Sequence, residues 1–97
     1  MLCAKDIVKR MIESLEQKGW KLCAVDDGNN EWQPVTTSEE VLDIAFGVHE
    51  AIIRFEKEKH FNTVLVIPMN GNDVISDHSN HNGFGKYMDE IIDNLTE

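Results

Sequence analysis

Apolar residues recur with the period of an α-helix near both ends of the chain. The first repeat comprises Ile7, Val8, Met11, Ile12 and Leu15, and the last comprises Phe84, Tyr87, Met88, Ile91, Ile92 and Leu95. Charged residues occupy many of the positions between them. This spacing predicts amphipathic helices over residues 4–18 and 84–95. Gly19 follows the first repeat, which is typical of the end of a helix.

A third helix is predicted in the middle of the chain. Thr36 with Glu39, or Thr37 with Glu40, has the spacing of a capping box. Two adjacent apolar stripes then follow at helical spacing, and they consist of Val41, Ala45, Val48, Ile52 and Phe55 and of Leu42, Phe46, His49 and Ile53. Adjacent stripes give a wide buried face, so we expect this helix to end near residue 59 and to form the centre of the core.

Four segments rich in β-branched and apolar residues read as strands. Residues 20–25 and 31–35 flank a segment dense in Asp, Gly and Asn, and residues 63–67 and 73–77 flank the tight-turn signal at 70–71. The predicted order is α-ββ-α-ββ-α. It implies an α+β fold with a four-stranded, mostly antiparallel sheet against which the helices pack. The predicted core centres on Phe46, Ile52, Val64, Val66, Met88 and Ile91.

The composition is that of one ordinary globular domain covering residues 1–97. Hydrophobic residues make up 41% and charged residues 28% of the 97, which suffices for one core. The longest apolar run, residues 63–69, is far shorter than the ~20 residues of a membrane helix. The N-terminus lacks a basic region followed by an apolar stretch. We therefore expect a cytoplasmic protein in which Cys3 and Cys23 are reduced.

Charge is distributed unevenly along the chain, whose net charge is -9. Residues 1–25 hold five basic and three acidic groups, whereas residues 26–97 hold four basic and fifteen acidic groups. Such a surface repels phosphates and anionic lipids, so direct binding to nucleic acids or membranes is disfavoured. The charge fits a basic protein partner or mimicry of nucleic acid, with plain solubility as the alternative.

A partner-binding face is predicted from the acids that lie outside the apolar helical stripes. These acids must point to solvent if the stripes are buried. Of Trp20 and Trp32, we expect one to be buried and the other to be partly exposed, where tryptophan commonly anchors an interface. The predicted partner-binding residues are Trp32, Glu39, Asp43, Glu50, Asp89, Glu90 and Asp93.

No catalytic residue and no cofactor are predicted. The cluster best suited to a metal is Asp77, His78 and His81, because carboxylate and imidazole groups are ligands for zinc and similar ions. A His-x-x-His loop without a clear fourth ligand is weak support for such a site. The favoured interpretation is a solvated polar loop without metal, in a protein that is not an enzyme.

Three segments together resemble small uncharacterised phage and prophage proteins. They are Asp27–Trp32, Glu40–Asp43 and Asn70–Asp77, within a resemblance that covers about residues 20–80. Proteins of this kind carry a similar acidic Gly-Glu-Trp hairpin, a helix and a second hairpin. The resemblance implies a mobile-element origin and products that bind host proteins, and it transfers no catalytic residue.

Three hypotheses follow for the function. The first is a small acidic accessory protein that binds and inhibits a host protein, as an anti-defence factor or a nucleic-acid mimic. The second is a small enzyme or metal-binding protein centred on the loop from Asp77 to His81. The third is a structural or assembly module that forms a homodimer through a sheet edge or a helix.

Overall fold

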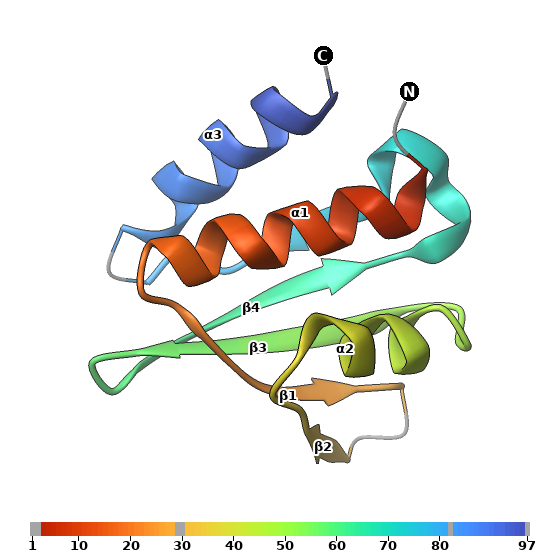
Figure 1. Cartoon of the computed structure of the whole chain (residues 1–97), viewed down its shortest axis with the longest axis horizontal. Helices are drawn as coiled ribbons and strands as arrows, with labels where there is room; N and C mark the ends of the chain where they lie inside the picture. Colours follow the sequence, from red (N-terminus) through yellow and green to blue (C-terminus); the bar gives the residue numbers. More distant parts are fainter. Residues whose placement is uncertain (1–2, 29–30, 82, 97) are drawn as a thin grey trace.

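The computed structural model of the protein describes residues 3–28, 31–81 and 83–96. Within these residues the chain forms three α-helices, five strands and one 3-10 helix (Figure 1). They are α1 (Ala4–Gln17), β1 (Lys21–Asp26), β2 (Trp32–Pro34), α2 (Ser38–Ala45), β3 (Ala51–Lys57), β4 (His60–Val66), η1 (Pro68–Asp73), β5 (Ile75–His78) and α3 (Phe84–Thr96). The predicted α+β class is confirmed. None of the helices in the described part of the chain is long and apolar enough to cross a membrane.

The strands form one antiparallel sheet in the order β2-β1-β3-β4-β5. All three helices lie on the same side of this sheet, and α1 runs between α2 and α3 (Figure 1). Burial alternates along β3: Ala51, Ile53 and Phe55 are buried, whereas the residues between them are only partly buried. The sheet therefore has one face covered by helices and a second face that no described element covers, which we call the open face.

The end of α1 follows the sequence prediction closely. Gly19 has a φ of 91°, a conformation that glycine adopts without steric cost. Its N–H donates to Glu16 O at 3.0 Å, and the N–H of Trp20 donates to Leu15 O at 3.0 Å. This is the hydrogen-bond pattern of a Schellman motif. It turns the chain so that Trp20 enters the core beside Phe84, with ring centroids 5.0 Å apart.

The prediction of a long central helix was wrong. The helix α2 begins as predicted, at the Thr37–Glu40 capping box, but it ends at Ala45. The chain then turns through residues 46–50 and continues as β3, the middle strand of the sheet. Five strands form where four were expected, because half of the predicted helix is a strand.

The hairpin that joins β3 to β4 turns at Glu58 and Lys59. Both residues have positive φ values, 51° and 69°, which is the requirement of a two-residue type I′ turn. Asn-Gly is the usual sequence for this turn, so the pair Glu-Lys gave no turn signal. The second predicted hairpin is present: β4 pairs with β5, and η1 replaces the expected tight turn between them.

The core is centred on Phe55, which lies on β3 and not on a long central helix. Phe55 is fully buried and its ring lies 6.2 Å from that of Phe84. Four predicted core residues are buried, namely Val64, Val66, Met88 and Ile91. Phe46 and Ile52 are only partly buried, since Phe46 lies just beyond the end of α2 and Ile52 points to the open face. His49, expected on an apolar stripe, is exposed in the turn before β3.

Candidate functional site: the open face of the sheet

A row of five side chains crosses the open face from one edge strand to the other. The strand register pairs Trp32 with Asp26, Asp26 with Ile52, Ile52 with Leu65, and Leu65 with Asp77. Directly paired residues of antiparallel strands project on the same side of the sheet. The row therefore presents an apolar pair at its centre, an acid on either side of that pair, and a tryptophan at the β2 edge.

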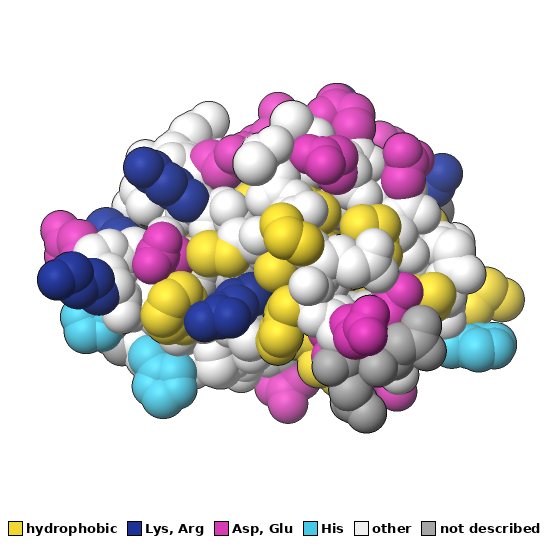
Figure 2. Space-filling model, turned by 90° about the horizontal axis from the view of Figure 1, so that it is seen from below, with side chains coloured by type: hydrophobic (Ala, Val, Ile, Leu, Met, Phe, Trp, Pro, Cys, Tyr) yellow, Lys and Arg dark blue, Asp and Glu magenta, His cyan; other side chains and the backbone are white. Residues whose placement is uncertain are grey.

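Beside this row lies an arginine stacked on aromatic rings. The guanidinium carbon of Arg54 is 4.0 Å from the centre of the Phe61 ring and 5.7 Å from that of Trp32. Both aromatic residues are 42% exposed, although most large hydrophobic residues of this chain are buried. Figure 2, seen from the β2 side, shows basic side-chain atoms set between hydrophobic side chains. We call these three residues the aromatic–arginine cluster.

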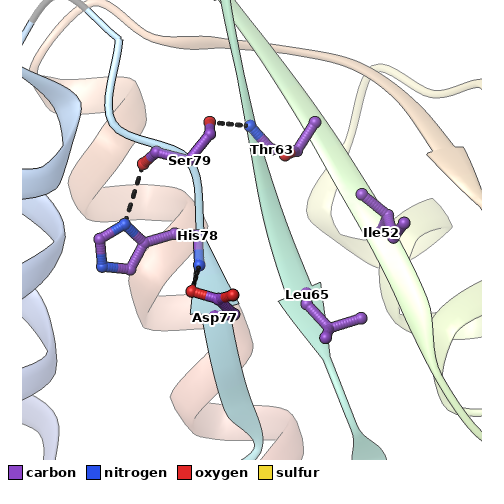
Figure 3. A pocket seen from close by; sticks show the side chains of 6 residues that line it. All are labelled: Ile52, Thr63, Leu65, Asp77, His78 and Ser79. Carbon is purple, nitrogen blue, oxygen red and sulfur yellow. Dashed lines mark hydrogen bonds between the residues drawn. The ribbon is translucent and has the colours of Figure 1, made fainter.

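Two shallow hollows lie on either side of the apolar pair. One, of about 300 Å³, is lined by Ile52, Thr63, Leu65, Asp77, His78 and Ser79. The other, of about 380 Å³, is lined by Asp26, Gly28, Glu50, Ile52 and Leu65. In Figure 3, Ile52 and Leu65 lie on neighbouring strands, with Asp77 on the next strand along. Each hollow thus combines an apolar floor with at least one carboxylate.

The carboxylates around the hollows carry uncompensated charge. In the described ranges, no ion pair joins Asp26, Glu50 or Asp77 to a basic side chain. Asp26 accepts a hydrogen bond from the N–H of Gly28 at 2.9 Å, and Asp77 accepts one from the N–H of His78 at 2.8 Å. These local bonds fix the orientation of both side chains and leave their negative charge available to a ligand.

Cys23 borders the aromatic–arginine cluster at a bulge in β1. Partial burial raises the pKa of its thiol, the carboxylate of Glu56 raises it further, and the guanidinium of Arg54 opposes the change. A raised pKa keeps the thiol protonated at neutral pH, and the protonated form is a poor nucleophile. Cys23 is thus a half-buried neighbour of the cluster and lacks the environment of a reactive cysteine.

The loop from Asp77 to His81 is held by a buried asparagine. Asn62 is 1% exposed; its Nδ2 donates to His81 O at 3.0 Å, and its Oδ1 accepts from Ser79 Oγ at 2.9 Å and from His81 N at 2.8 Å. Ser79 Oγ in turn accepts from Thr63 N at 2.8 Å. These bonds satisfy the buried polar atoms of the asparagine and tie the loop to β4.

The two histidines of this loop do not converge on one point. His78 Nδ1 lies 2.9 Å from Ser79 O, and its imidazole points away from Ile52 and Leu65 (Figure 3). His78 Nε2 is 3.9 Å from Asp89 Oδ1, and His81 is exposed. Among the described residues, no three His, Cys, Asp or Glu side chains are grouped as metal ligands would be. The arrangement is that of a loop fixed by hydrogen bonds.

The structure divides the predicted partner-binding residues between several places. Trp32 lies on the open face and Glu50 lines one of its hollows. The remaining acids are exposed on two helices, Glu39 and Asp43 on α2 and Asp89, Glu90 and Asp93 on α3. Between these helices runs α1, on which three basic residues, Lys5, Lys9 and Arg10, and three acidic residues, Asp6, Glu13 and Glu16, are exposed. The helical acids on α2 and α3 therefore form two groups with a helix of mixed charge between them.

Sequence reasoning missed most of the open face. Ile52 and Arg54 were placed in a helix, and Phe61 was left between elements. The signal that could have found them is the alternation of apolar and charged residues from Ile53 to Glu56, which follows the apolar residues Ala51 and Ile52. Comparisons with known protein families, with curated proteins and with solved structures give no match, so the functional inference rests on this geometry.

Proposed function

We propose that this protein is an accessory protein without enzymatic activity that binds another protein through the open face of its sheet. The observation that carries the proposal is the aromatic–arginine cluster on a sheet face that none of the described helices or loops covers. Tryptophan and arginine are enriched among the residues that dominate binding energy in protein interfaces. Arg54 on β3 packs against Phe61 on the neighbouring strand β4 and lies near Trp32 on β2. These side chains are therefore ordered before binding, which reduces the entropy lost on association.

The charge of the molecule favours a protein over a nucleic acid as the partner. Exposed aromatic side chains on a sheet can also stack on nucleic-acid bases. Here, however, the acids Asp26, Glu50 and Asp77 surround the exposed apolar groups, and the net charge is -9. Phosphates would be repelled from this face, whereas a basic protein surface would be attracted.

The same charge argues against a second copy as the main occupant. Two copies brought together at their open faces would each contribute a net charge of -9. Both edge strands are also short, with three residues in β2 and four in β5, so edge-to-edge pairing offers few hydrogen bonds. The resemblance to phage and prophage proteins makes host proteins the first group in which to search for the partner, and inhibition of that partner is the corresponding mode of action.

Affinity capture with matched variants tests the proposal. The immobilised protein is compared with Trp32→Ala, Arg54→Ala and Phe61→Ala, which alter the open face. Two controls alter exposed residues elsewhere, Met69→Ala on η1 and Lys9→Ala on α1. A further double variant, Asp89→Lys with Glu90→Lys, reverses charge on α3. Circular dichroism and thermal unfolding establish that each variant is folded.

The expected result is one host protein retained by the wild type and by both controls and lost, by at least tenfold, from the open-face variants. A partner that is lost only when the α3 acids are reversed would reject the open face and would favour the helical acids instead. A partner that binds all variants equally would reject both surfaces.

A further inference from the structure

We infer that the segment recognised by the open face is an extended peptide with an apolar side chain flanked by two basic side chains, in the pattern basic-x-apolar-x-basic. This inference rests on the proposed function and adds the chemistry of the partner. It derives from the row that runs from Asp26 through Ile52 and Leu65 to Asp77.

The spacing of the row sets the spacing of the ligand. Asp26 and Asp77 lie on β1 and β5, three strand intervals apart in the sheet order. Neighbouring strands are about 4.8 Å apart, so the two acids are separated by roughly 14 Å. An extended chain rises about 3.3 Å per residue, so four residues cover about 13 Å. Residues i and i+4 of such a chain therefore reach the two acids.

The pattern between the two ends follows from strand geometry. In an extended peptide, residues i, i+2 and i+4 project to the same side. When i and i+4 reach Asp26 and Asp77, residue i+2 lies over Ile52 and Leu65. These two side chains form the apolar floor shared by both hollows. An aliphatic or aromatic residue at i+2 would bury apolar surface there, whereas a polar residue would be desolvated without a partner.

The charge on the face selects basic residues at the two ends. Within the described residues, Asp26, Glu50 and Asp77 make no ion pair, so no basic side chain of this chain competes with a ligand for them. Asp26 and Glu50 line the same hollow, which gives that end of the row two carboxylates. Arg54, a basic group beside the row, is stacked on Phe61. A cation at each end of the peptide would therefore meet an acid.

Titration with defined peptides tests the inference. The probe is a blocked Gly-Lys-Thr-Leu-Thr-Lys-Gly peptide, added to isotope-labelled protein and followed by two-dimensional amide NMR. Three matched peptides serve as controls: one with Glu for both Lys, one with Ser for Leu, and one of the same composition with both Lys adjacent. The protein variants are Asp26→Asn and Asp77→Asn, which keep an oxygen for the local hydrogen bond and remove the charge.

The expected result is saturable binding of the probe, at least tenfold tighter than the Glu and Ser control peptides and two- to fivefold tighter than the adjacent-Lys peptide, with shifts centred on Ile52 and Leu65. Each Asn variant should weaken binding two- to fivefold, the range of exposed ion pairs. Equal binding of the adjacent-Lys peptide, or shifts confined to α2 and α3, would overturn the inference. That failure is distinguishable from failure of the proposed function, because capture of a partner through Trp32, Arg54 and Phe61 does not depend on this peptide.

Discussion

The guanidinium of Arg54 stacks on the ring of Phe61 at 4.0 Å, and no carboxylate pairs with it in the part of the chain that the structure describes. This arrangement stands out in a chain with 18 acidic and nine basic residues. The stack holds the arginine in place, while its N–H groups have no acceptor among the described residues. An arginine ordered in this way can donate to a partner without first breaking an internal ion pair.

A double-mutant cycle on Arg54 and Phe61 should detect this stack. We expect a coupling energy of about 0.5–1 kcal/mol between Arg54→Ala and Phe61→Ala in urea unfolding, as for cation–π pairs at exposed sites. Arg54→Lys should retain part of that energy, since an ammonium also binds to an aromatic face. A coupling energy indistinguishable from zero would mean that the stack does not persist in solution.

Phe55, and not Phe46, should dominate the stability of the core. Phe55 is fully buried at the centre of the sheet, so Phe55→Ala should reduce the free energy of unfolding by about 3–5 kcal/mol. Phe46 is partly exposed after the end of α2, and Phe46→Ala should cost roughly 1–2 kcal/mol. Urea unfolding of both variants provides the comparison, and equal losses would contradict the placement of β3 in the core.

The turn between β3 and β4 should be open to stabilisation. Glu58 and Lys59 adopt positive φ, which costs most non-glycine residues about 1–2 kcal/mol each. The double variant Glu58→Asn, Lys59→Gly should therefore raise the free energy of unfolding by about 1 kcal/mol or more. Lys59→Ala is the control, because alanine keeps the strain and should give no gain. A destabilised Asn-Gly variant would argue against the type I′ turn.

This turn also explains where prediction from the sequence succeeded and where it did not. In α1 and α3 the apolar residues repeat only with the period of a helix, and Gly19 marks the end of α1. The ends of both helices were therefore predicted within about one residue. The apolar residues of segment 48–57 fit two different spacings. Val48, Ile52 and Phe55 have the spacing of a helix, whereas Ala51, Ile53 and Phe55 have the spacing of a strand. A turn signal at 58–59 would have decided between them, and none is present.

The open face could not be predicted from the sequence, because it depends on how distant segments pair. Its residues share a surface only when β3 lies between β1 and β4, a relationship set by long-range strand pairing. Trp32 was predicted as an interface anchor from its residue type alone. Its neighbours Arg54 and Phe61 could not be grouped with it until the sheet order was known.

Stability should depend on pH through Glu40. Its carboxylate accepts hydrogen bonds from Thr36 N at 3.1 Å and Thr37 N at 3.2 Å, and from both hydroxyl groups. These bonds, those of Thr36 first, lower the pKa of Glu40 below its ordinary value of 4.5. A lowered pKa in the folded state means that this stabilisation is present above pH 4.5 and is lost as pH falls through the lowered pKa.

Glu40→Gln isolates that contribution, because glutamine retains an acceptor oxygen and does not titrate. The wild type should be more stable than the variant at pH 7, and the difference should shrink as pH falls towards 3. Chemical denaturation across this range gives the difference directly. A difference that stays constant with pH would show that the charge of Glu40 does not contribute.

The two cysteines should report on occupancy of the open face. Cys3 is exposed at the start of α1, in the helix layer, whereas Cys23 is half-buried in β1 beside Arg54 and Glu56. We expect a thiol reagent at pH 7.5 to label Cys3 faster than Cys23, because partial burial limits access and raises the pKa of the Cys23 thiol. Labelling of Cys23 should then accelerate with rising pH through a range above that of an ordinary cysteine.

A bound partner should slow labelling of Cys23 further and leave labelling of Cys3 unchanged, which mass spectrometry of the labelled peptides would measure. Protection of Cys3 alone would place the partner on the helices, and the open face would then no longer account for binding.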